Sequence, residues 1–352
     1  MNKLVHIFLC LVLLVSPSAV FSFETDQFNL PEKPLADIGA EVHDYVEENV
    51  GTAIEKINAE IKTRQVCLDN ESRKTCESAI KNRRRLSYLR SDQALAREVF
   101  KRLGAGFPPF TASGGWMEAH RFNAQPARYK TDFKTSIYAT FPSNYLTISE
   151  TVNLYGEQFG TDKIAHIYQQ GYTYLRIYER ALEKGLSKEA ATKKANDWGR
   201  KSERTFYGNL VSGVYSNADL AANFAGLKFY QNLTGQINIG DQVKLPLVVL
   251  ENGFWKFNEN IELTENLLKP FVTAHLNEAF NPSIYTKVFG LRSSVRGRVV
   301  KYACADWKTL YPNRSKADFD EIFRRLQTWH GEEYGFTVNP NFITVSNTCY
   351  AE

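Results

Sequence analysis

Beyond its first 22 residues, the sequence lacks any apolar run approaching the roughly 20 residues that a membrane-spanning helix requires. Charge of one sign is also scarce, because the formal net charge of the 352 residues is only +4. So small a charge gives no reason to expect a nucleic-acid partner. A local basic run at residues 83–85 is typical of a solvated helix face, and an anionic-polymer site is the alternative.

Familiar catalytic motifs are missing as well. The sequence contains no G-x-S-x-G nucleophile elbow, no P-loop, no dinucleotide fingerprint and no H-E-x-x-H zinc motif. No motif of these classes therefore identifies a reaction, and a prediction of function must start from other clusters of polar residues.

The first 22 residues have the pattern of a signal peptide. Lys3 precedes an apolar stretch at 4–15, Pro17 follows it, and 20–22 offers a cleavage site with a small residue at its end. We expect this segment to be removed, leaving an exported chain, periplasmic or secreted, without a transmembrane span. An uncleaved anchor is the alternative.

Four cysteines remain in the expected mature chain: Cys67, Cys76, Cys304 and Cys349. An even number in an exported protein indicates two disulfides. We favour Cys67 with Cys76 and Cys304 with Cys349, because closing the short local loop loses the least chain entropy. A zinc site is the weaker interpretation, since no two of them form a C-x2-C pair.

The hydrophobic content of 43% and charged content of 23% are those of an ordinary globular protein. Apolar periodicity and capping residues predict helices at 36–64, 78–103, 161–184, 187–211, 217–233, 270–279, 293–310 and 315–329. The predicted fold class is mainly α, a helical-bundle core with one small β-hairpin, a long irregular connection and two disulfides.

Four segments follow from this pattern. Residues 1–22 are the signal peptide, and 23–103 are a polar N-terminal arm followed by a helical hairpin. Residues 104–146 are an irregular connection, rich in glycine, proline and aromatic residues, which can act as a lid over a site. Residues 147–352 are the helical core domain, with the hairpin near 243–257, where Asn-Gly provides a turn.

The strongest candidate site lies between residues 162 and 226. Asp162 and His166 are four residues apart, and so are Asp219 and Asn223, so each pair shares one helix face. Glu203 lies on the expected helix between them. Short connections make neighbouring helices antiparallel, an arrangement that brings all five side chains together.

Two functional interpretations follow for this constellation. Asp162, His166 and Asp219 have the side chains to bind a divalent metal, the one cofactor that the sequence suggests. Alternatively, Glu203, His166 and Asp219 act as catalytic acid and base without a metal.

The structural alternative explains each residue separately. Ser216 and Asp219 form a capping box, and Asp162 lies where a helix dipole favours an anion. Asn223 is a satisfied core amide, and Gly226 permits close helix packing. Glu203 pairs in solvent with its basic neighbours, Arg200, Lys201 and Arg204.

A second polar patch is found at His275 and Glu278, which share a face if the expected helix at 270–279 forms. With Asn223, these two residues are our candidates for substrate binding. A solvated polar helix face is the simpler explanation for the patch.

The order Asp162-Lys163-x-x-His166, then Glu203, then Ser216-x-x-Asp219-x-x-x-Asn223-x-x-Gly226 resembles the signature of VanZ-like and YfiM-type envelope proteins. The resemblance covers residues 162–226 alone. It implies a helical bacterial envelope protein in which these residues converge. VanZ-like proteins carry the pattern on membrane helices, whereas this chain has water-compatible side chains there.

Taken together, these patterns predict an exported bacterial envelope protein. The leading hypothesis is a hydrolase of cell-wall glycan, peptide or lipid head groups, with Glu203 as general acid or base. A non-catalytic envelope or partner-binding protein with a structural polar cluster is the rival, and a toxin or effector is a third possibility. The sequence identifies no substrate, no particular metal and no oligomeric state.

Overall fold

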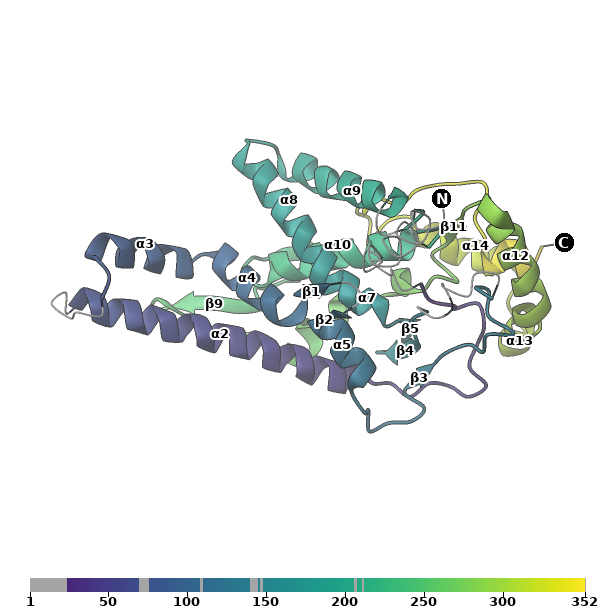
Figure 1. Ribbon diagram of the computed structural model, residues 1–352, viewed down its shortest axis with the longest axis horizontal. Coiled ribbons are helices and arrows are strands. Elements are labelled where there is room, and N and C mark those ends of the chain that lie inside the picture. Colours follow the sequence, from purple (N-terminus) through teal and green to yellow (C-terminus); the bar gives the residue numbers. More distant parts are fainter. Residues whose placement is uncertain are drawn as a thin grey trace, which may run out of the picture.

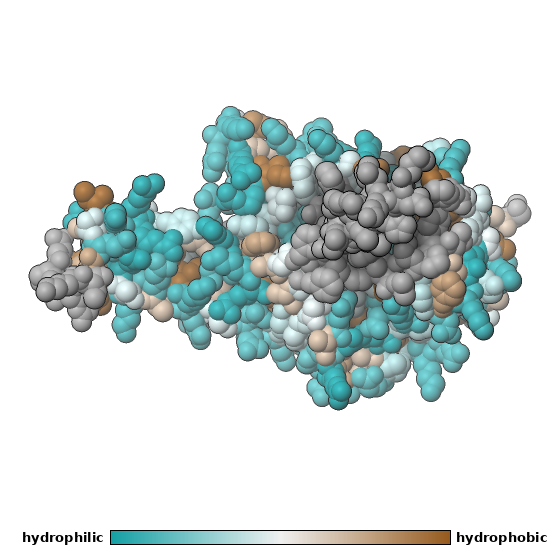
Figure 2. Space-filling model, viewed as in Figure 1, coloured by the Kyte–Doolittle hydropathy of each residue, from teal (hydrophilic) through white to brown (hydrophobic). Residues whose placement is uncertain are grey.

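The computed structural model describes residues 24–69, 76–107, 110–139, 145, 148–205, 208–210 and 212–351. The expected signal peptide at 1–22 lies outside these residues. The molecule is elongated, with an arm that projects from a larger body (Figure 1). Hydrophilic side chains cover most of the arm's visible surface (Figure 2). No helix in these ranges combines the length and apolar character that a membrane crossing requires.

Helices dominate, as predicted. The α-helices are α2 (Gly39–Asp69), α3 (Ala79–Leu89), α4 (Asp92–Leu103), α5 (Ala112–Ala119), α7 (Asp162–Ala165), α8 (Gly171–Glu183), α9 (Lys188–Arg204), α10 (Asn217–Asn232), α11 (Leu263–Asn266), α12 (Leu291–Arg298), α13 (Cys304–Leu310), α14 (Lys316–Arg325) and α15 (Val345–Cys349). Two π-helical turns, η1 (His166–Gln170) and η5 (Val299–Ala303), continue α7 and α12, and three short 3₁₀ turns are η2 (Lys269–Phe271), η3 (Ala274–Leu276) and η4 (Val288–Gly290).

The strands form small antiparallel sheets. They are β1 (Gly106–Phe107), β2 (Phe110–Thr111), β3 (Arg128–Tyr129), β4 (Thr151–Leu154), β5 (Glu157–Gly160), β6 (Val214–Ser216), β7 (Ile237–Ile239), β8 (Gln242–Lys244), β9 (Val248–Glu251), β10 (Phe254–Phe257) and β11 (Ser283–Tyr285). The pairs are β1–β2, β7–β8, β9–β10 and β6–β11, and β3, β4 and β5 form a three-stranded sheet.

The arm contains α2, α3 and the β9–β10 hairpin (Figure 1). The disulfide Cys67–Cys76 joins α2 to the segment before α3. Trp255 of the hairpin fixes both helices, because its indole N–H donates to the Leu89 carbonyl and its backbone N–H to Asn58 of α2. Both predicted disulfides are present, since Cys304 is bonded to Cys349 in the body.

In the body, α8 packs against α9 and α10. Almost every residue of α10 is buried, so this helix runs through the interior instead of exposing a polar face. Buried side chains of α2, α8 and α10 belong to one continuous core, and those of α12, α13 and α15 belong to a second, smaller one.

Several predicted elements differ from the structure. The predicted single helix at 78–103 is two helices, because Ser91 caps α4 by accepting from the Ala94 N–H. The predicted helix at 270–279 is wrong, and only η2 and η3 form there. The hairpin predicted near 243–257 is confirmed, because β9 and β10 pair around the Asn252-Gly253 turn. A second hairpin, β7–β8, precedes it and was not predicted.

The polar segment before α2, which the sequence predicted to be an extended N-terminal arm, is buried in the protein where the structure describes its first residues, 24–29. Residues 24–29 are all buried, including Glu24 and Asp26, each 2% exposed. Asp26 accepts hydrogen bonds from the backbone N–H groups of Asn29 and Ile137. The Phe28 carbonyl accepts from the Trp307 indole of α13. Hydrogen bonding therefore compensates Asp26 for the loss of water.

Candidate functional site

The site is built where α7 begins, directly after β5. Asp162 is the first residue of α7, and its Oδ1 accepts a hydrogen bond of 2.9 Å from the Thr25 hydroxyl of the buried N-terminal segment. His166, four residues on, lies where the α-helix widens into the π-turn η1. Such single π-turns are frequent at functional sites.

Two glycines allow α10 to approach this turn closely. A Cβ atom on Gly226 would lie 2.0 Å from the Ile167 carbonyl oxygen, and one on Gly171 would lie 2.5 Å from the Gly226 Cα. Because no larger residue fits either position, Gly226 has a packing role, as the structural interpretation of the motif proposed. The close approach places Asp219 and Asn223 of α10 against His166.

Lys163 is the centre of the cluster. Its Nζ lies 2.5 Å from Asp162 Oδ2, 2.6 Å from Asp219 Oδ1 and 2.5 Å from Glu278 Oε1. The lysine side chain is 0% exposed. Burial alone would lower its pKa, but the surrounding carboxylates raise the pKa well above the ordinary value. Lys163 is therefore a buried ammonium group that neutralises part of the negative charge.

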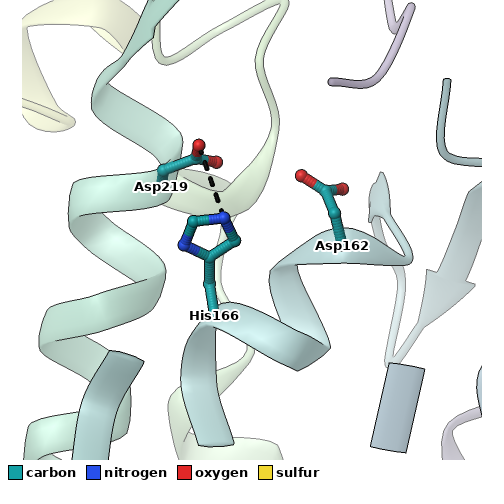
Figure 3. A group of neighbouring side chains, drawn as sticks. All are labelled: Asp162, His166 and Asp219. Carbon is teal, nitrogen blue, oxygen red and sulfur yellow. Dashed lines mark ion pairs between the residues drawn. The ribbon is translucent and has the colours of Figure 1, made fainter. Parts of the chain in front are cut away.

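His166 is held in a fixed orientation. Its Nδ1 donates to the Asn223 side-chain oxygen at 2.9 Å, and its Nε2 lies 3.5 Å from Asp219 Oδ2. Figure 3 shows the imidazole directed toward Asp219, with Asp162 nearby on the helix that carries His166. Ligand atoms of Asp162, His166 and Asp219 all lie within 4.8 Å of one another, which is compatible with a shared metal ion.

Two further glutamates surround this centre. Glu203, near the end of α9, is 1% exposed, and its Oε2 accepts a long hydrogen bond of 3.5 Å from the Ser216 N–H. Glu24 accepts a hydrogen bond of 2.7 Å from the Ser212 hydroxyl. Glu203 Oε1, Glu24 Oε2 and Glu278 Oε2 have no hydrogen-bond partner among the described residues.

The carboxyl groups of the cluster differ in their pKa. Burial raises the pKa of Glu203 and Glu24 well above the ordinary value, and nearby Asp219 adds to the effect. Burial also raises the pKa of Glu278 to about 7, although Lys163 opposes it. Asp219 behaves in the opposite way: burial would raise its pKa, but His166 and Lys163 lower it overall. The site thus combines carboxyl groups of raised pKa with one of lowered pKa.

Six of the seven predicted site residues come together: Asp162, His166, Glu203, Asp219, Asn223 and Glu278. His275 does not join them. Its Nε2 bonds to the Thr328 carbonyl, its ring packs edge-on against Tyr334, and burial lowers its pKa to about 4. Glu278 reaches the cluster from the irregular segment after η3, so it does not share a helix face with His275.

Sequence reasoning assigned no role to two members of the cluster. Lys163 belongs to the recognised motif, but a lysine beside an aspartate at a helix start resembles an ordinary surface pair. Glu24 lies in a polar segment with no helical or strand pattern, so nothing local distinguishes it. In the structure both Lys163 and Glu24 are buried beside the carboxylates of the cluster.

The glutamate of the predicted motif was also open to a simpler explanation. Glu203 follows Arg200 and precedes Arg204, so a solvated ion pair was the alternative. Instead, Arg200 pairs with Asp197 and Glu333, and Glu203 points into the interior.

No protein-family model matches the sequence, and neither a curated protein nor a solved structure shows significant similarity to the chain.

Proposed function

We propose that this chain is an exported hydrolase of the bacterial cell envelope, acting on cell-wall glycan, peptide or lipid head groups. One observation carries the proposal: burial raises the pKa of Glu203, whereas His166 and Lys163 overcome burial to lower the pKa of neighbouring Asp219. Neighbouring carboxyl groups with pKa values pushed apart are the usual arrangement of an acid and a base in one active site. The motif's resemblance to envelope proteins and the two disulfides support the assignment to the envelope.

In this proposal Asp162, His166 and Asp219 hold a divalent cation. Lys163 contacts one oxygen of each aspartate. Asp219 Oδ2 and Asp162 Oδ1, which also accepts from the Thr25 hydroxyl, would bind the cation beside His166 Nε2. Asn223 accepts from the other ring nitrogen and so keeps Nε2 turned toward Asp219. A divalent cation supplies a water whose pKa is lowered toward neutrality.

Glu203 is the proton carrier. Because burial favours the protonated form of its carboxyl group, Glu203 can give a proton to the leaving group while water attacks the scissile bond. The attacking water gives a proton back to the Glu203 carboxylate, so the group returns to its starting state. The Lys163 ammonium group compensates the negative charge of the remaining carboxylates, which include Glu278 with its pKa of about 7.

The test compares Glu203→Gln with wild type on isolated wall glycan, wall peptides and phospholipid vesicles, following release of sugar ends, amines and head groups. Loss of a general acid costs about a hundredfold or more in rate. We expect that loss without a change in thermal unfolding. The matched control is Glu259→Gln, whose side chain is 78% exposed. A folded Glu203→Gln protein with undiminished hydrolysis would contradict the proposal.

A non-catalytic partner-binding protein is the second candidate. The observation that favours it is burial, since Lys163 and Asp219 are both 0% exposed. In that case the cluster is structural, and Asp162→Ala or Asp219→Ala should cost about 1–3 kcal/mol of stability with no activity to lose. Variants that keep their thermal stability would exclude this candidate. The unpartnered oxygens of Glu203, Glu24 and Glu278 argue against a fully satisfied network.

A further inference from the structure

The far end of the projecting arm has a surface that the proposed hydrolysis does not use. With a rise of about 1.5 Å per residue, α2 is roughly 45 Å long and carries this end away from the body. Figure 1 shows α3 lying beside α2 there, on the side of the molecule opposite α12 and α14. The disulfide Cys67–Cys76 ties the two helices together near the end.

Helix α3 has one buried face and one exposed face. Asn82, Leu86 and Leu89 are buried against the arm. Ile80, Arg83, Arg84 and Ser87 are exposed and recur at the spacing of a single helix face. We call these four residues the outer face of α3. Lys81 flanks it and is exposed as well.

Among the residues that the structure describes, the positive charges of this face have no acidic partners. Two other cations of the arm are paired, since Arg64 bonds to Glu77 and Glu60, and Arg85 bonds to Glu60. For Lys81, Arg83 and Arg84, in contrast, the described residues supply no ion pair or hydrogen bond to the side chain. The outer face therefore presents a local positive charge, although the chain as a whole is nearly neutral.

An exposed aliphatic side chain stands among these charges. Ile80 is 80% exposed, the highest fraction among the large hydrophobic residues of the described ranges. Val66, next to the disulfide on α2, is 40% exposed. Figure 2 shows a hydrophobic spot near the end of the mostly hydrophilic arm. A polyanion needs only the cations, whereas a bilayer also accepts the aliphatic group below its head groups.

We propose that the outer face of α3 docks the protein peripherally on an anionic phospholipid bilayer. Arg83, Arg84 and Lys81 contact lipid phosphates, and Ile80 enters the boundary between head groups and acyl chains. This contact is independent of hydrolysis: it depends on the arm, and the candidate active site depends on α7 and α10. Each basic residue near such a surface adds to the affinity, and the contribution weakens as salt rises.

Cosedimentation of the full chain with vesicles tests this inference. The vesicles are pure phosphatidylcholine, or phosphatidylcholine with one quarter phosphatidylglycerol, at low and high salt. We expect binding to the anionic vesicles only, weakened by salt. Arg83→Glu with Arg84→Glu should reduce the partition coefficient by about tenfold or more. Ile80→Ser should reduce it severalfold.

Two matched controls separate this surface from general charge and hydrophobicity. Lys194→Glu with Lys201→Glu makes the same charge change on exposed positions of α9, and Val338→Ser removes another aliphatic side chain, one that is 75% exposed. Both should bind as wild type. Absence of wild-type binding to anionic vesicles, or equal losses in the controls, would overturn the inference. Equal binding by Ile80→Ser, with full competition by heparin, would identify a soluble polyanion as partner and also overturn it.

Discussion

The central cluster and the arm both contain a network of ion pairs, with opposite consequences for the pKa of a carboxyl group. On the arm, Glu60 pairs with Arg64 and Arg85, whose side chains are 25% and 40% exposed, and the Arg85 hydrogen bonds lower the pKa of Glu60. In the centre, Lys163 and its carboxylate partners are at most 4% exposed, and burial raises the pKa of Glu278.

The difference shows that burial, and not the number of ion pairs, makes a charge cluster chemically useful. The Arg85 hydrogen bonds stabilise the partly exposed carboxylate of Glu60, so it is ionised at neutral pH. Removing water from a cluster with more carboxyl groups than cations forces some of them to keep their protons. Groups that exchange protons near neutral pH are those that can act as acids and bases.

The largest expected effect comes from removing the central cation. Lys163→Met leaves Asp162, Asp219 and Glu278 without their shared partner, and breaking a buried ion pair in this way costs about 3–5 kcal/mol. Arg85→Met on the arm should cost at most about 1 kcal/mol, because that pair is exposed. Urea unfolding of both variants measures the comparison. Similar losses for the two would show that burial does not distinguish the clusters.

The stability contributed by each disulfide gives a second comparison between the arm and the body. Cys304–Cys349 closes a separation of 45 residues, and Cys67–Cys76 closes one of 9. Loop-closure entropy gives about 4 kcal/mol for the longer loop and about 2.5 kcal/mol for the shorter one. Thermal unfolding of the paired Cys→Ser variants should therefore show the greater loss for Cys304 and Cys349. The reverse order would contradict a chain-entropy origin.

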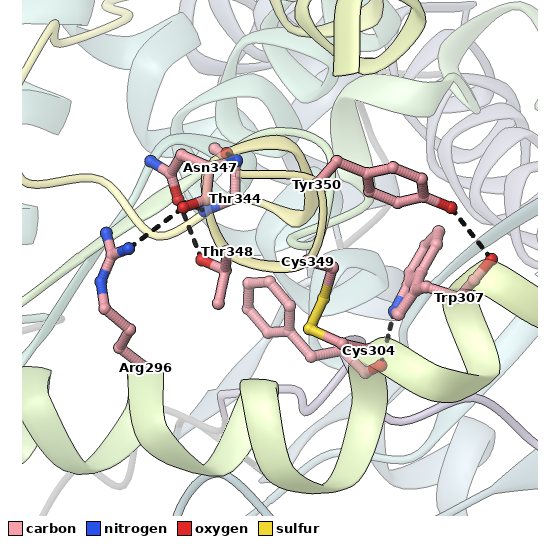
Figure 4. Close-up of a disulfide and its surroundings, with 9 residues drawn as sticks. Arg296, Cys304, Trp307, Thr344, Asn347, Thr348, Cys349 and Tyr350 are labelled. Carbon is pink, nitrogen blue, oxygen red and sulfur yellow. Dashed lines mark hydrogen bonds between the residues drawn. A yellow bond between two sulfur atoms is a disulfide. The ribbon is translucent and has the colours of Figure 1, made fainter. Parts of the chain in front are cut away.

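We expect removal of the longer disulfide, Cys304–Cys349, to weaken the contacts between the C-terminal segment and α13 as well. Figure 4 shows Cys349 beside Tyr350, whose hydroxyl donates to the Trp307 carbonyl at 3.2 Å. On the other side, Arg296 of α12 donates to the Asn347 carbonyl. The disulfide and these hydrogen bonds tie the C-terminal segment to α12 and α13, and Trp307 in turn donates to Phe28.

A smaller effect is expected in the pH dependence of stability. Burial raises the pKa of Glu278 from 4.5 to about 7, so the folded state binds this proton more tightly than the unfolded chain. Its contribution to the free energy of unfolding therefore falls as pH rises from about 4.5 to about 7. Glu278→Gln should flatten this fall by up to about 3 kcal/mol.

The arm supplies the control for that measurement. The pKa of Glu60 is lowered, chiefly by the Arg85 hydrogen bonds, so its titration lies below the same pH window. Glu60→Gln should leave the slope between pH 5 and pH 7.5 unchanged. Urea unfolding across this range measures both variants, and a Glu278→Gln slope equal to that of wild type would refute the raised pKa.

Much of the fold was predictable from local patterns. The apolar repeat of Val42, Val46 and Val50 predicted α2, and Ser187 predicted the start of α9, where its hydroxyl accepts from the Ala190 N–H. The disulfide pairing followed from loop length. Elements without periodicity were missed, including β7–β8 and the burial of residues 24–29, because long-range contacts determine them.

The site was predictable only where local helical spacing determines its contacts. Helical spacing brought Asp162 to His166 and Asp219 to Asn223, and short connections indicated that α9 returns toward them. The contribution of Glu24 depends on a segment more than 100 residues away in sequence, and that of Glu278 depends on an irregular turn. No local pattern encodes either contact. The irregular turn that brings Glu278 to the cluster also directs His275 away from it, toward the Thr328 carbonyl.

The most direct test of the central claim is elemental analysis of protein produced in an oxidising compartment, comparing wild type with His166→Ala and with His275→Ala as the matched histidine control. The claim predicts close to one divalent metal ion per chain in wild type and in the control, and its loss in His166→Ala. Metal-free wild-type protein that fails to bind added divalent cations, or equal metal content in all three proteins, would contradict it.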